Sequence, residues 1–474
     1  MAEVSLPDGF RFGVATAGFQ VEGGFNGPGE PANNWGTWEQ TGRVEPSGIA
    51  LDFWGRYEEQ LDRAVAAGCD SFRLSVEWAR CEPVEGSLDE DAVAGYLAIL
   101  DACRDRGMEP LVTISHFTHP AWLGEDFWLR PESPERMAGW AEALVARLGD
   151  RCTRWVTVNE PNILAIESYV GGAFPPGRLG DAAAAVRALD HMLAAHVRCY
   201  GVIHDHQPGG VAAINPYCLS VYEVDQLLTD VLMARSAGIE RDQLRPWLSE
   251  RRTRWHERLV RPGQGLDRLK ELALRRVAAR LVPLDQALPV TTAAVYDSRY
   301  PGTIDVAQLD YYDPVSAHHL RVPGHRTAGG RHWFADQPLW DYRPDPSGLT
   351  RFVTDNHHDG LGVWVVENGL CNRVRRGRSI PRLDGWDRVR YLREHLSAVV
   401  AAIEAGVPVG GYWHWTLADN YEWGSYEPRF GLYGVDRERG LRWSELDSMG
   451  VDAAGAYRRL ADGLRQGDRS VLVS

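Results

Sequence analysis

Short apolar segments alternate with longer amphipathic segments along almost the whole chain. The apolar segments have the length and the branched and aromatic side chains of buried strands. Eight of them are candidate strands: Phe12–Ala17, Ser71–Ser75, Leu111–Ser115, Trp155–Val158, Val211–Asn215, Val306–Tyr311, Gly362–Val366 and Val409–His414. The clearest segments with helical spacing lie between them: Tyr57–Ala67, Asp89–Arg106, Pro134–Gly149, Ala182–His204 and Trp386–Ala405. This alternation predicts strand–helix units around a parallel sheet, and eight of them predict an α/β fold, a single (β/α)8 TIM barrel over residues 1–474.

Two segments interrupt this alternation and are expected to be long insertions in the loops of the barrel. Asp225–Leu288 carries Arg, Leu and Glu at helical spacing, so it predicts a helical insertion between the fifth and sixth strands. Its charge run Arg251–Arg254 indicates a solvated helix face rather than a partner site. Ala317–Thr350 is rich in Pro, Gly and aromatic residues. Loops on that side of a barrel usually build the substrate entrance.

Composition and charge narrow the class of protein. With 44% hydrophobic, 24% charged and 10% aromatic residues, the chain can bury an extensive core, which excludes a disordered, collagen-like or disulfide-stapled protein. The formal net charge of −14 gives no reason to expect binding to nucleic acid or to a membrane, and a neutral substrate fits better. Lys270 is the only lysine, so a Schiff-base mechanism is not expected.

The cysteines and the N-terminal residues bear on location. Seven cysteines without a C-x-x-C pair indicate neither a disulfide framework nor a thiolate zinc site. The first residues lack a basic segment followed by an apolar run, and no stretch of about 18 apolar residues occurs. We therefore expect a cytoplasmic protein without a membrane anchor. The sequence leaves the oligomeric state open.

Polar side chains stand at the ends of most predicted strands. Active sites of TIM barrels lie at the C-terminal ends of the strands, so these residues carry more functional weight than polar residues elsewhere. They are Gln20 after the first strand, Arg73 within the second, His116 after the third, Asn159 and Glu160 after the fourth, Glu367 after the seventh, and Trp415, Glu422 and Trp423 after the eighth.

Glu160 and Glu367 are the most informative of these residues. Each ends an apolar strand, TRWVTV or LGVWVV, where an unpaired ionised group would be costly. Either one alone could belong to a structural ion pair, but together with Arg73 they point to catalysis. Two carboxylates among polar and aromatic side chains are what cleavage of a glycosidic bond needs: one protonates the leaving oxygen, and the other attacks or activates water. Trp415 and Trp423 flank Glu422 at a spacing that suits a sugar platform with a polar clamp.

The motifs around these residues resemble glycoside hydrolase family 1, the β-glucosidase and β-galactosidase family, and look most like its archaeal-type β-glycosidases. The match runs nearly from end to end. It rests on FRFGVATAGFQVEGG, RLSVEWARCEP, TVNEPN followed by YVGGAFPPG, VVENG, and GYWHWTLADNYEWGSYEPRFGLYGVD. NEP and ENG alone would indicate only a broad clan of barrel hydrolases, whereas WTLADNYEW is specific to this family.

The resemblance implies a retaining β-glycosidase that removes a terminal non-reducing β-D-glycosyl residue, such as glucose or galactose, from a small-molecule glycoside. It implies that Glu160 is the general acid/base and Glu367 the nucleophile, with Arg73, Asn159 and Tyr312 around them. It also implies that the sugar hydroxyls bind to Gln20, His116, Asn159, Glu422 and Trp423, with Trp415 stacking beneath the ring. No metal and no organic cofactor are implied.

Elementary electrostatics agrees with these roles. Arg73 and the phenol of Tyr312 should favour the ionised form of Glu367, while the charge of Glu367 and apolar surroundings should keep Glu160 protonated. Two positions depart from the family pattern: Phe117 stands where a tryptophan usually follows the histidine, and Asp310 where G-x-N-Y-Y has asparagine. Asp310 should raise the pKa of Glu367 by like-charge repulsion unless it is paired elsewhere.

Other functions fit the sequence less well. A transglycosidase would use the same covalent intermediate with an acceptor other than water, and the sequence does not separate it from a hydrolase. A sugar-binding pseudoenzyme would have lost a carboxylate, and both are present. The pair His116 and His119, and the run 357–359 (His-His-Asp), lack an evident third metal ligand. The glycines of VEGGFNGPGEP do not lie between a strand and a helix as those of a phosphate-binding loop do.

Overall fold

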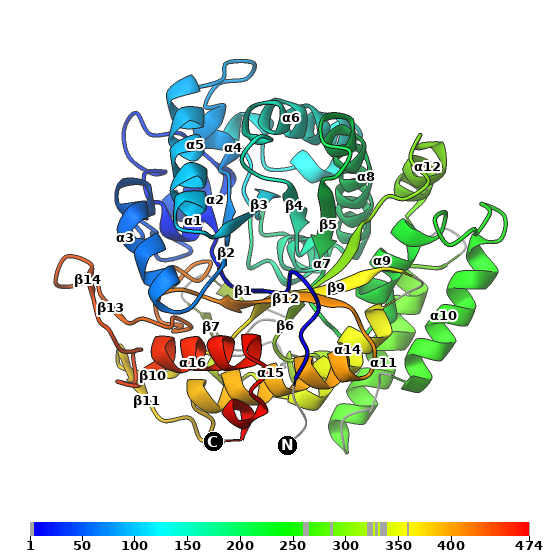
Figure 1. Ribbon diagram of the computed structural model, residues 1–474. Helices are drawn as coiled ribbons and strands as arrows, with labels where there is room; N and C mark the ends of the chain where they lie inside the picture. Colours follow the sequence, from blue (N-terminus) through cyan, green and yellow to red (C-terminus); the bar gives the residue numbers. More distant parts are fainter. Residues whose placement is uncertain are drawn as a thin grey trace.

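The structure is a computed structural model that describes residues 4–258, 265–284, 288–319, 326–327, 330–331, 339–357 and 360–473. Its centre is a barrel of eight parallel strands (Figure 1). The strands are β1 Arg11–Ala15, β2 Ser71–Ser75, β3 Glu109–Ser115, β4 Arg154–Asn159, β5 Val211–Asn215, β6 Val306–Tyr311, β9 Gly362–Asn368 and β12 Val409–Trp415. All eight predicted strands are therefore present, and the prediction of a TIM barrel is confirmed.

Neighbouring strands follow the order β5-β4-β3-β2-β1-β12-β9-β6. The barrel closes between β5 and β6, where the amide of Asp305 donates to the carbonyl of Ala212 (3.2 Å) and the amide of Cys218 to the carbonyl of Asp310 (2.9 Å). Because all strands are parallel, their C-terminal ends meet at one face. The fourth strand and the seventh, β9, thus open onto the same face.

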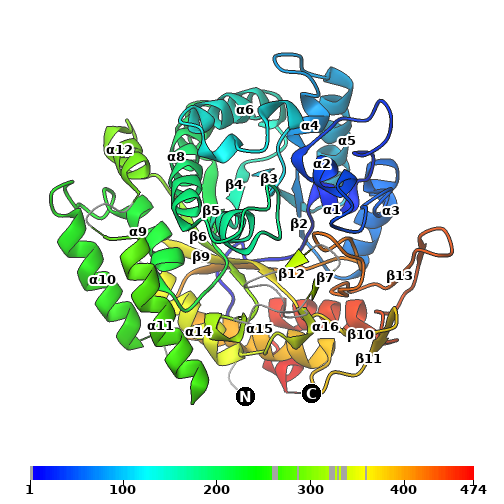
Figure 2. The ribbon, with the colours of Figure 1, turned by 180° about the vertical axis from the view of Figure 1, so that it is seen from behind.

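Helices surround the barrel, and the five predicted ones are present. They are α3 Phe53–Ala66, α5 Glu90–Asp105, α6 Ser133–Leu148, α8 Ala182–His206 and α15 Arg388–Glu404. Helices α5, α8 and α15 each follow an aspartate, Asp89, Asp181 or Asp387, whose side chain accepts an amide hydrogen bond from the first turn. Such caps satisfy amides that a helix leaves unpaired. The two chain ends lie near one another, where the amide of Val4 donates to the carbonyl of Gly467 (3.0 Å; Figure 1 and Figure 2).

Further helices, turns and small ribbons complete the fold. The further α-helices are α1 Gly18–Val21, α2 Asn34–Gln40, α4 Trp78–Cys81, α7 Pro161–Ile166, α9 Gln226–Met233, α10 Leu244–Arg258, α11 Leu266–Leu281, α12 Pro289–Asp297, α13 Ser316–His319, α14 Pro346–Asn356 and α16 Ala453–Arg465. The 3-10 turns are η1 Ala121–Leu123, η2 Phe127–Leu129, η4 Tyr222–Val224, η5 Leu339–Asp341 and η6 Arg469–Leu472, and η3 Glu167–Gly171 is a π-helical turn. The small antiparallel ribbons pair β7 Arg326–Thr327 with β8 Gly330–Arg331, β10 Arg373–Arg375 with β11 Arg378–Ile380, and β13 Val435–Asp436 with β14 Arg442–Trp443.

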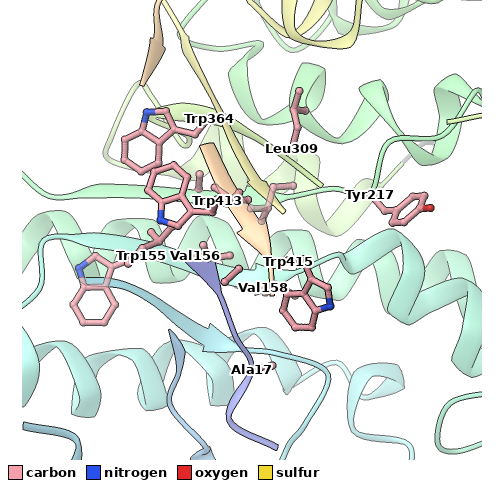
Figure 3. Close-up of a cluster of buried hydrophobic side chains, with 14 of the residues drawn as sticks. Ala17, Trp155, Val156, Val158, Tyr217, Leu309, Trp364, Trp413 and Trp415 are labelled. Carbon is pink, nitrogen blue, oxygen red and sulfur yellow. The ribbon is translucent and has the colours of Figure 1, made fainter. Parts of the chain in front are cut away.

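Large aromatic side chains fill the barrel (Figure 3). The indoles of Trp364 and Trp413 lie 5.7 Å apart between centroids, and Trp413 Nε1 donates to the hydroxyl of Ser71 (3.0 Å). Gly13 makes room for this indole, because a Cβ there would lie 2.2 Å from the ring of Trp413. This packed interior supports the C-terminal face of the barrel.

The predicted insertion at 225–288 is helical in its described residues. Helices α9, α10 and α11 form a group on one side of the barrel (Figure 1 and Figure 2). The second insertion, 317–350, lies partly outside the described residues. None of the described helices combines the length and the apolar run needed to cross a bilayer.

The charge run on α10 differs from the prediction of a solvated face. Arg251 pairs with the fully buried Asp230 (2.8 Å), and Arg252 pairs with the fully buried Glu223 (3.4 Å). Only Arg254, which pairs with Glu250 on the same helix, is mostly exposed. Arg251 therefore joins α10 to α9 within the insertion, and Arg252 joins α10 to η4 just before it, because a buried carboxylate needs a cationic partner.

Candidate active site

A cavity of about 990 Å³ opens at the C-terminal ends of the barrel strands. Seven of the ten side chains predicted at the site line it: His116, Glu160, Tyr312, Glu367, Trp415, Glu422 and Trp423. The other three, Gln20, Arg73 and Asn159, are buried behind its wall. The structure thus brings all ten residues together, although they come from both ends of the sequence.

Glu160 and Glu367 face each other across this cavity. Glu160 follows β4 in a left-handed backbone conformation (φ 37°), and Pro161 after it begins α7. Glu367 lies within β9. One carboxylate oxygen from each of them and one from Asp310 lie within 4.8 Å of one another. Both glutamates are nearly buried, so the cavity places two acidic groups against each other in a site of low polarity.

Arg73 connects the centre of the site. Its Nη1 donates to Glu367 Oε1 (2.5 Å), its Nη2 donates to Asn159 Oδ1, and its Nε donates to the hydroxyl of Thr113 (3.1 Å). The phenol of Tyr312 donates to the other oxygen of Glu367 (3.0 Å). Both oxygens of Glu367 therefore accept a hydrogen bond, and its charge faces a fully buried guanidinium.

Asn215 at the end of β5 was not among the predicted site residues. Its Nδ2 donates to Asn159 Oδ1 (2.7 Å) and to Asp310 Oδ2 (2.5 Å), so it joins the fourth strand to the sixth. The segment VAAIN ends in a polar residue as the fourth strand does. The rule applied to the other strand ends would have found it.

Burial and like charge determine the protonation of the carboxyl groups. The pKa of Glu160 is raised well above its usual value by burial and then by the charge of Glu367. Burial also raises the pKa of Glu367, although Arg73 and Tyr312 lower it, so the predicted influence of these two groups is present but does not outweigh burial. The ordering is as expected: Glu160 holds its proton more strongly than Glu367.

Asp310 acts differently from the expected repulsion. Its side chain lowers the pKa of Glu367 through a hydrogen bond, a contribution smaller than burial and Arg73. The repulsion falls instead on Asp310 itself, whose pKa is raised well above normal by burial and then by the charges of Glu367 and Glu160. Asp310 is therefore a protonated carboxyl group beside two glutamates.

The other end of the cavity is built around Glu422. Gln20 Nε2 donates to its Oε2 (3.2 Å), and Trp415 Nε1 donates to its Oε1 (3.0 Å). Burial raises the pKa of Glu422 to about 8, against these hydrogen bonds. The ring of Trp423 stacks on His116, with 5.7 Å between centroids and 20° between planes. This end offers carboxyl, amide, imidazole and indole groups to a polyhydroxylated ligand.

Several buried polar atoms at this end have no hydrogen-bond partner within the part of the chain that the structure describes. They are Gln20 Oε1, His116 Nδ1 and Asn159 Nδ2. Burial, and then the charge of Arg73, lowers the pKa of His116 well below normal, so its ring is neutral. Native proteins seldom leave such atoms unsatisfied. Phe117 beside them lines the cavity and has no donor to offer.

Two of the histidines considered as metal ligands, His119 and His357, contact backbone carbonyl groups instead. The Nε2 of His119 contacts the carbonyl of Gly124 (3.2 Å), and burial lowers its pKa to about 4. Positions 358 and 359 lie outside the described residues, and Nδ1 of His357 contacts the carbonyl of Leu361 (2.8 Å). Within the described ranges, the one cluster whose spacing suits a metal ion is Glu160, Asp310 and Glu367. Arg73 beside Glu367 competes with a cation there.

Two opposed carboxyl groups at the C-terminal face of a TIM barrel are the arrangement that a glycoside hydrolase needs. Residues 2–446 match the family model described as Glycosyl hydrolase family 1, and the chain belongs to this family. It is a β-glucosidase-like hydrolase of a family that retains the anomeric configuration.

Two curated relatives and one solved structure illustrate the range of the family. The bifunctional β-D-glucosidase/β-D-fucosidase of Bifidobacterium breve is 30% identical over 91% of this chain and 94% of its own. The 6-phospho-β-galactosidase 1 of Streptococcus pneumoniae is 26% identical over 94% of this chain and 97% of its own. The structure of a β-glucosidase from Thermotoga maritima in complex with noeuromycin is 25% identical, with a TM-score of 0.70 over 99% of both chains.

Proposed function

We propose that this protein hydrolyses small β-glycosides at a terminal, unphosphorylated sugar residue, with Glu367 as nucleophile and Glu160 as general acid/base. The observation that carries the proposal is the close approach of the two carboxyl groups, since one oxygen of Glu160 lies within 4.8 Å of one oxygen of Glu367. Retaining enzymes hold them about 5–5.5 Å apart, whereas inverting enzymes leave room for a water molecule. The hydrogen bond of Arg73 to Glu367, with no arginine hydrogen bond among those described on Glu160, supports Glu367 as the group that ionises first.

The two steps follow from the protonation of the pair. Glu367 attacks the anomeric carbon while Glu160 gives its proton to the leaving oxygen, which yields a covalent glycosyl ester and a free alcohol. Esterification removes the charge of Glu367, which is the second cause of the raised pKa of Glu160. Glu160 then takes a proton from water, and the attack of this water on the anomeric carbon releases the sugar and Glu367.

The experiment that tests the mechanism is stereochemical. Proton NMR of the first sugar released from an aryl β-glycoside should show the β anomer, and a 2-fluoro glycoside should label Glu367. An α anomer appearing first would exclude a covalent intermediate on this residue. A screen of aryl β-glycosides that differ only in the sugar would identify the preferred sugar, because the leaving group is held constant.

Phosphorylated sugars are expected to be poor substrates. One relative is a 6-phospho-β-galactosidase, but this site presents Glu422, and the only lysine of the chain, Lys270, lies in the insertion helix α11. A phosphate beside Glu422 would meet a carboxyl group instead of a cation. We expect kcat/KM for a 6-phosphoglycoside to be lower than for the plain glycoside. The opposite order would contradict the assignment of Glu422 to sugar recognition.

Replacing Asp310 with Asn should leave both limbs of the pH profile of kcat/KM nearly in place. The side chain of Asp310 lowers the pKa of Glu160 and the pKa of Glu367 through hydrogen bonds, and an amide also donates a hydrogen bond. Burial and the charges of both glutamates raise the pKa of Asp310 itself well above normal, so its own charge is absent while the two glutamates titrate.

The measurement is a pH profile of kcat/KM for both forms of the protein. Other groups that face Glu160 and Glu367 are present in both forms: Arg73, Tyr312 and Glu422. A shift caused by Glu422, whose pKa is about 8, would therefore appear equally in both profiles. An alkaline limb that moves to lower pH on substitution would show instead that Asp310 is charged while Glu160 titrates.

A further inference from the structure

The active-site cavity has two chemically different parts. The inner part is lined by Glu160, Glu367, Glu422 and the indoles of Trp415 and Trp423. The wall beyond Glu160 is formed by apolar side chains from two separate parts of the chain: Ile163, Ile166, Val170, Phe174, Leu219 and Val221. Outside the inner part, the lining also includes the polar residues Arg43, Glu45, Glu167, Tyr217, Ser316, His319, Tyr342, Ser425 and Glu427. A leaving group bonded to the sugar would lie against the apolar wall, because Glu160 at its inner edge must reach the bond that is cleaved.

The insertion helix α11 completes this wall. Leu274, Val277, Ala278 and Leu281 line the cavity, and their spacing of three and four residues places them on one face of the helix. Val277 is 50% exposed and Leu281 is 47% exposed. Side chains of this kind that remain half-exposed inside a concave site are poised to be covered by a ligand.

The size of the cavity also exceeds what a sugar needs. At about 990 Å³ it lies at the upper end of the range for sites that hold drug-sized molecules, roughly 300–1,000 Å³. One sugar ring between Trp415 and Glu160 fills the inner part only. The rest of the space is left to the aglycone.

Glu167 is the carboxyl group within the apolar wall. It lies in the π-helical turn η3, a kind of turn that is frequent at functional sites. Burial raises its pKa to about 7, and its Oε2 has no hydrogen-bond partner among the described residues. A single hydroxyl group on an otherwise apolar ligand would satisfy it.

We propose that the aglycone side of this cavity, completed by α11, selects a large hydrophobic alcohol with a hydrocarbon skeleton rather than a second sugar. The inference rests on the proposed function, since it concerns the leaving group of the same reaction. A second sugar would bring several hydroxyl groups against Ile163, Val170, Leu274 and Val277, where they would lose their water without gaining partners. A hydrocarbon skeleton would lose no hydrogen bonds and would cover the exposed faces of Val277 and Leu281.

The test uses alkyl β-glycosides of the preferred sugar, from ethyl to octyl, whose leaving alcohols have similar acidity. Each assay is run below the concentration at which the octyl glycoside forms micelles. We expect kcat/KM to rise by about two- to fourfold per methylene group, and by about 60-fold or more from ethyl to octyl. A disaccharide with the same terminal sugar should be hydrolysed less efficiently than the octyl glycoside. No rise with chain length, or preference for the disaccharide, would overturn the proposal.

Substitutions on α11 locate the effect. Val277→Gln and Leu281→Gln should each lower the octyl-to-ethyl ratio of kcat/KM by about three- to tenfold, because they place an amide against the alkyl chain. Leu269→Gln is the matched control, since Leu269 is 63% exposed on the same helix and does not line the cavity. An equal fall in the control would mean that α11 acts through its packing and would overturn the proposal.

The two proposals fail in different ways. Hydrolysis of aryl glycosides that depends on Glu367, together with a flat alkyl series, would contradict only the hydrophobic aglycone. Absence of hydrolysis of every glycoside would contradict the proposed function and the aglycone with it.

Discussion

Replacing Glu367 with Gln is expected to lower kcat/KM by about four orders of magnitude or more for every substrate. The amide has nearly the volume of the carboxylate but cannot form the ester. Arg73 would lose its ionised partner, and breaking a buried pair costs about 3–5 kcal/mol when nothing replaces it. Here Asp310 and Glu160 lie within 4.8 Å, and either can release its proton and restore a negative charge. We therefore expect the fold to survive, as circular dichroism and thermal unfolding would show.

A smaller side chain at the same position provides the control. Glu367→Ala leaves space on the side of the sugar opposite the leaving group, which azide can enter. With an activated aryl β-glycoside, azide should restore turnover and give an α-glycosyl azide, because attack from that side inverts the anomeric centre once. A β product, or activity of the Gln form near that of the unaltered protein, would contradict the role of Glu367.

The barrel could be predicted from the sequence because each strand is a short apolar run bounded by turn residues. The runs at Ser71–Ser75, Val211–Asn215 and Val306–Tyr311 coincide with β2, β5 and β6. The closed parallel arrangement then forces residues 160 and 367 to one face, however far apart they are in sequence. The site residues that stand at the end of a strand could therefore be predicted from the sequence.

The aglycone wall could not be predicted in this way. Leu274, Val277 and Leu281 form an ordinary apolar stripe in the sequence, and such a stripe usually packs onto a core. That it faces the cavity depends on how α11 packs against α13, η4 and α8, which is a matter of tertiary packing. The inward pairing of Arg251 and Arg252 has the same origin, because their buried partners lie on other elements.

The protonation of Asp310 also needed the structure. In sequence it is a carboxyl group near the nucleophile, and like charge should then disturb Glu367. In the folded protein, Asn215 donates a hydrogen bond to one carboxyl oxygen of Asp310. Burial, together with the charges of Glu367 and Glu160, keeps the proton on Asp310. Whether Asp310 raises or lowers the pKa of Glu367 therefore depends on which of the two groups keeps its proton. Arg73 decides this, because it favours the ionised form of Glu367.

Replacing Glu160 with Gln is expected to give a loss that depends on the leaving group. The amide resembles protonated Glu160 in charge and size, so Glu367 and Arg73 keep their surroundings. It cannot transfer a proton, and positioned acid catalysis contributes about 10²–10⁴-fold. Alkyl glycosides, whose alcohols leave poorly without a proton, should lose kcat/KM by about this factor. Dinitrophenyl glycosides, whose leaving group departs without a proton, should lose little of their kcat/KM.

The second step distinguishes this role from simple damage to the site. Without a base to activate water, the ester on Glu367 should accumulate, so kcat and KM for a dinitrophenyl glycoside should fall together. Glu160→Ala with azide should give a β-glycosyl azide, because azide then enters from the side that the leaving group vacated and inverts the ester once more. This product is the opposite anomer to that expected from Glu367→Ala. Equal losses for alkyl and dinitrophenyl glycosides, or an α product from the Glu160 variant, would exclude Glu160 as the acid/base.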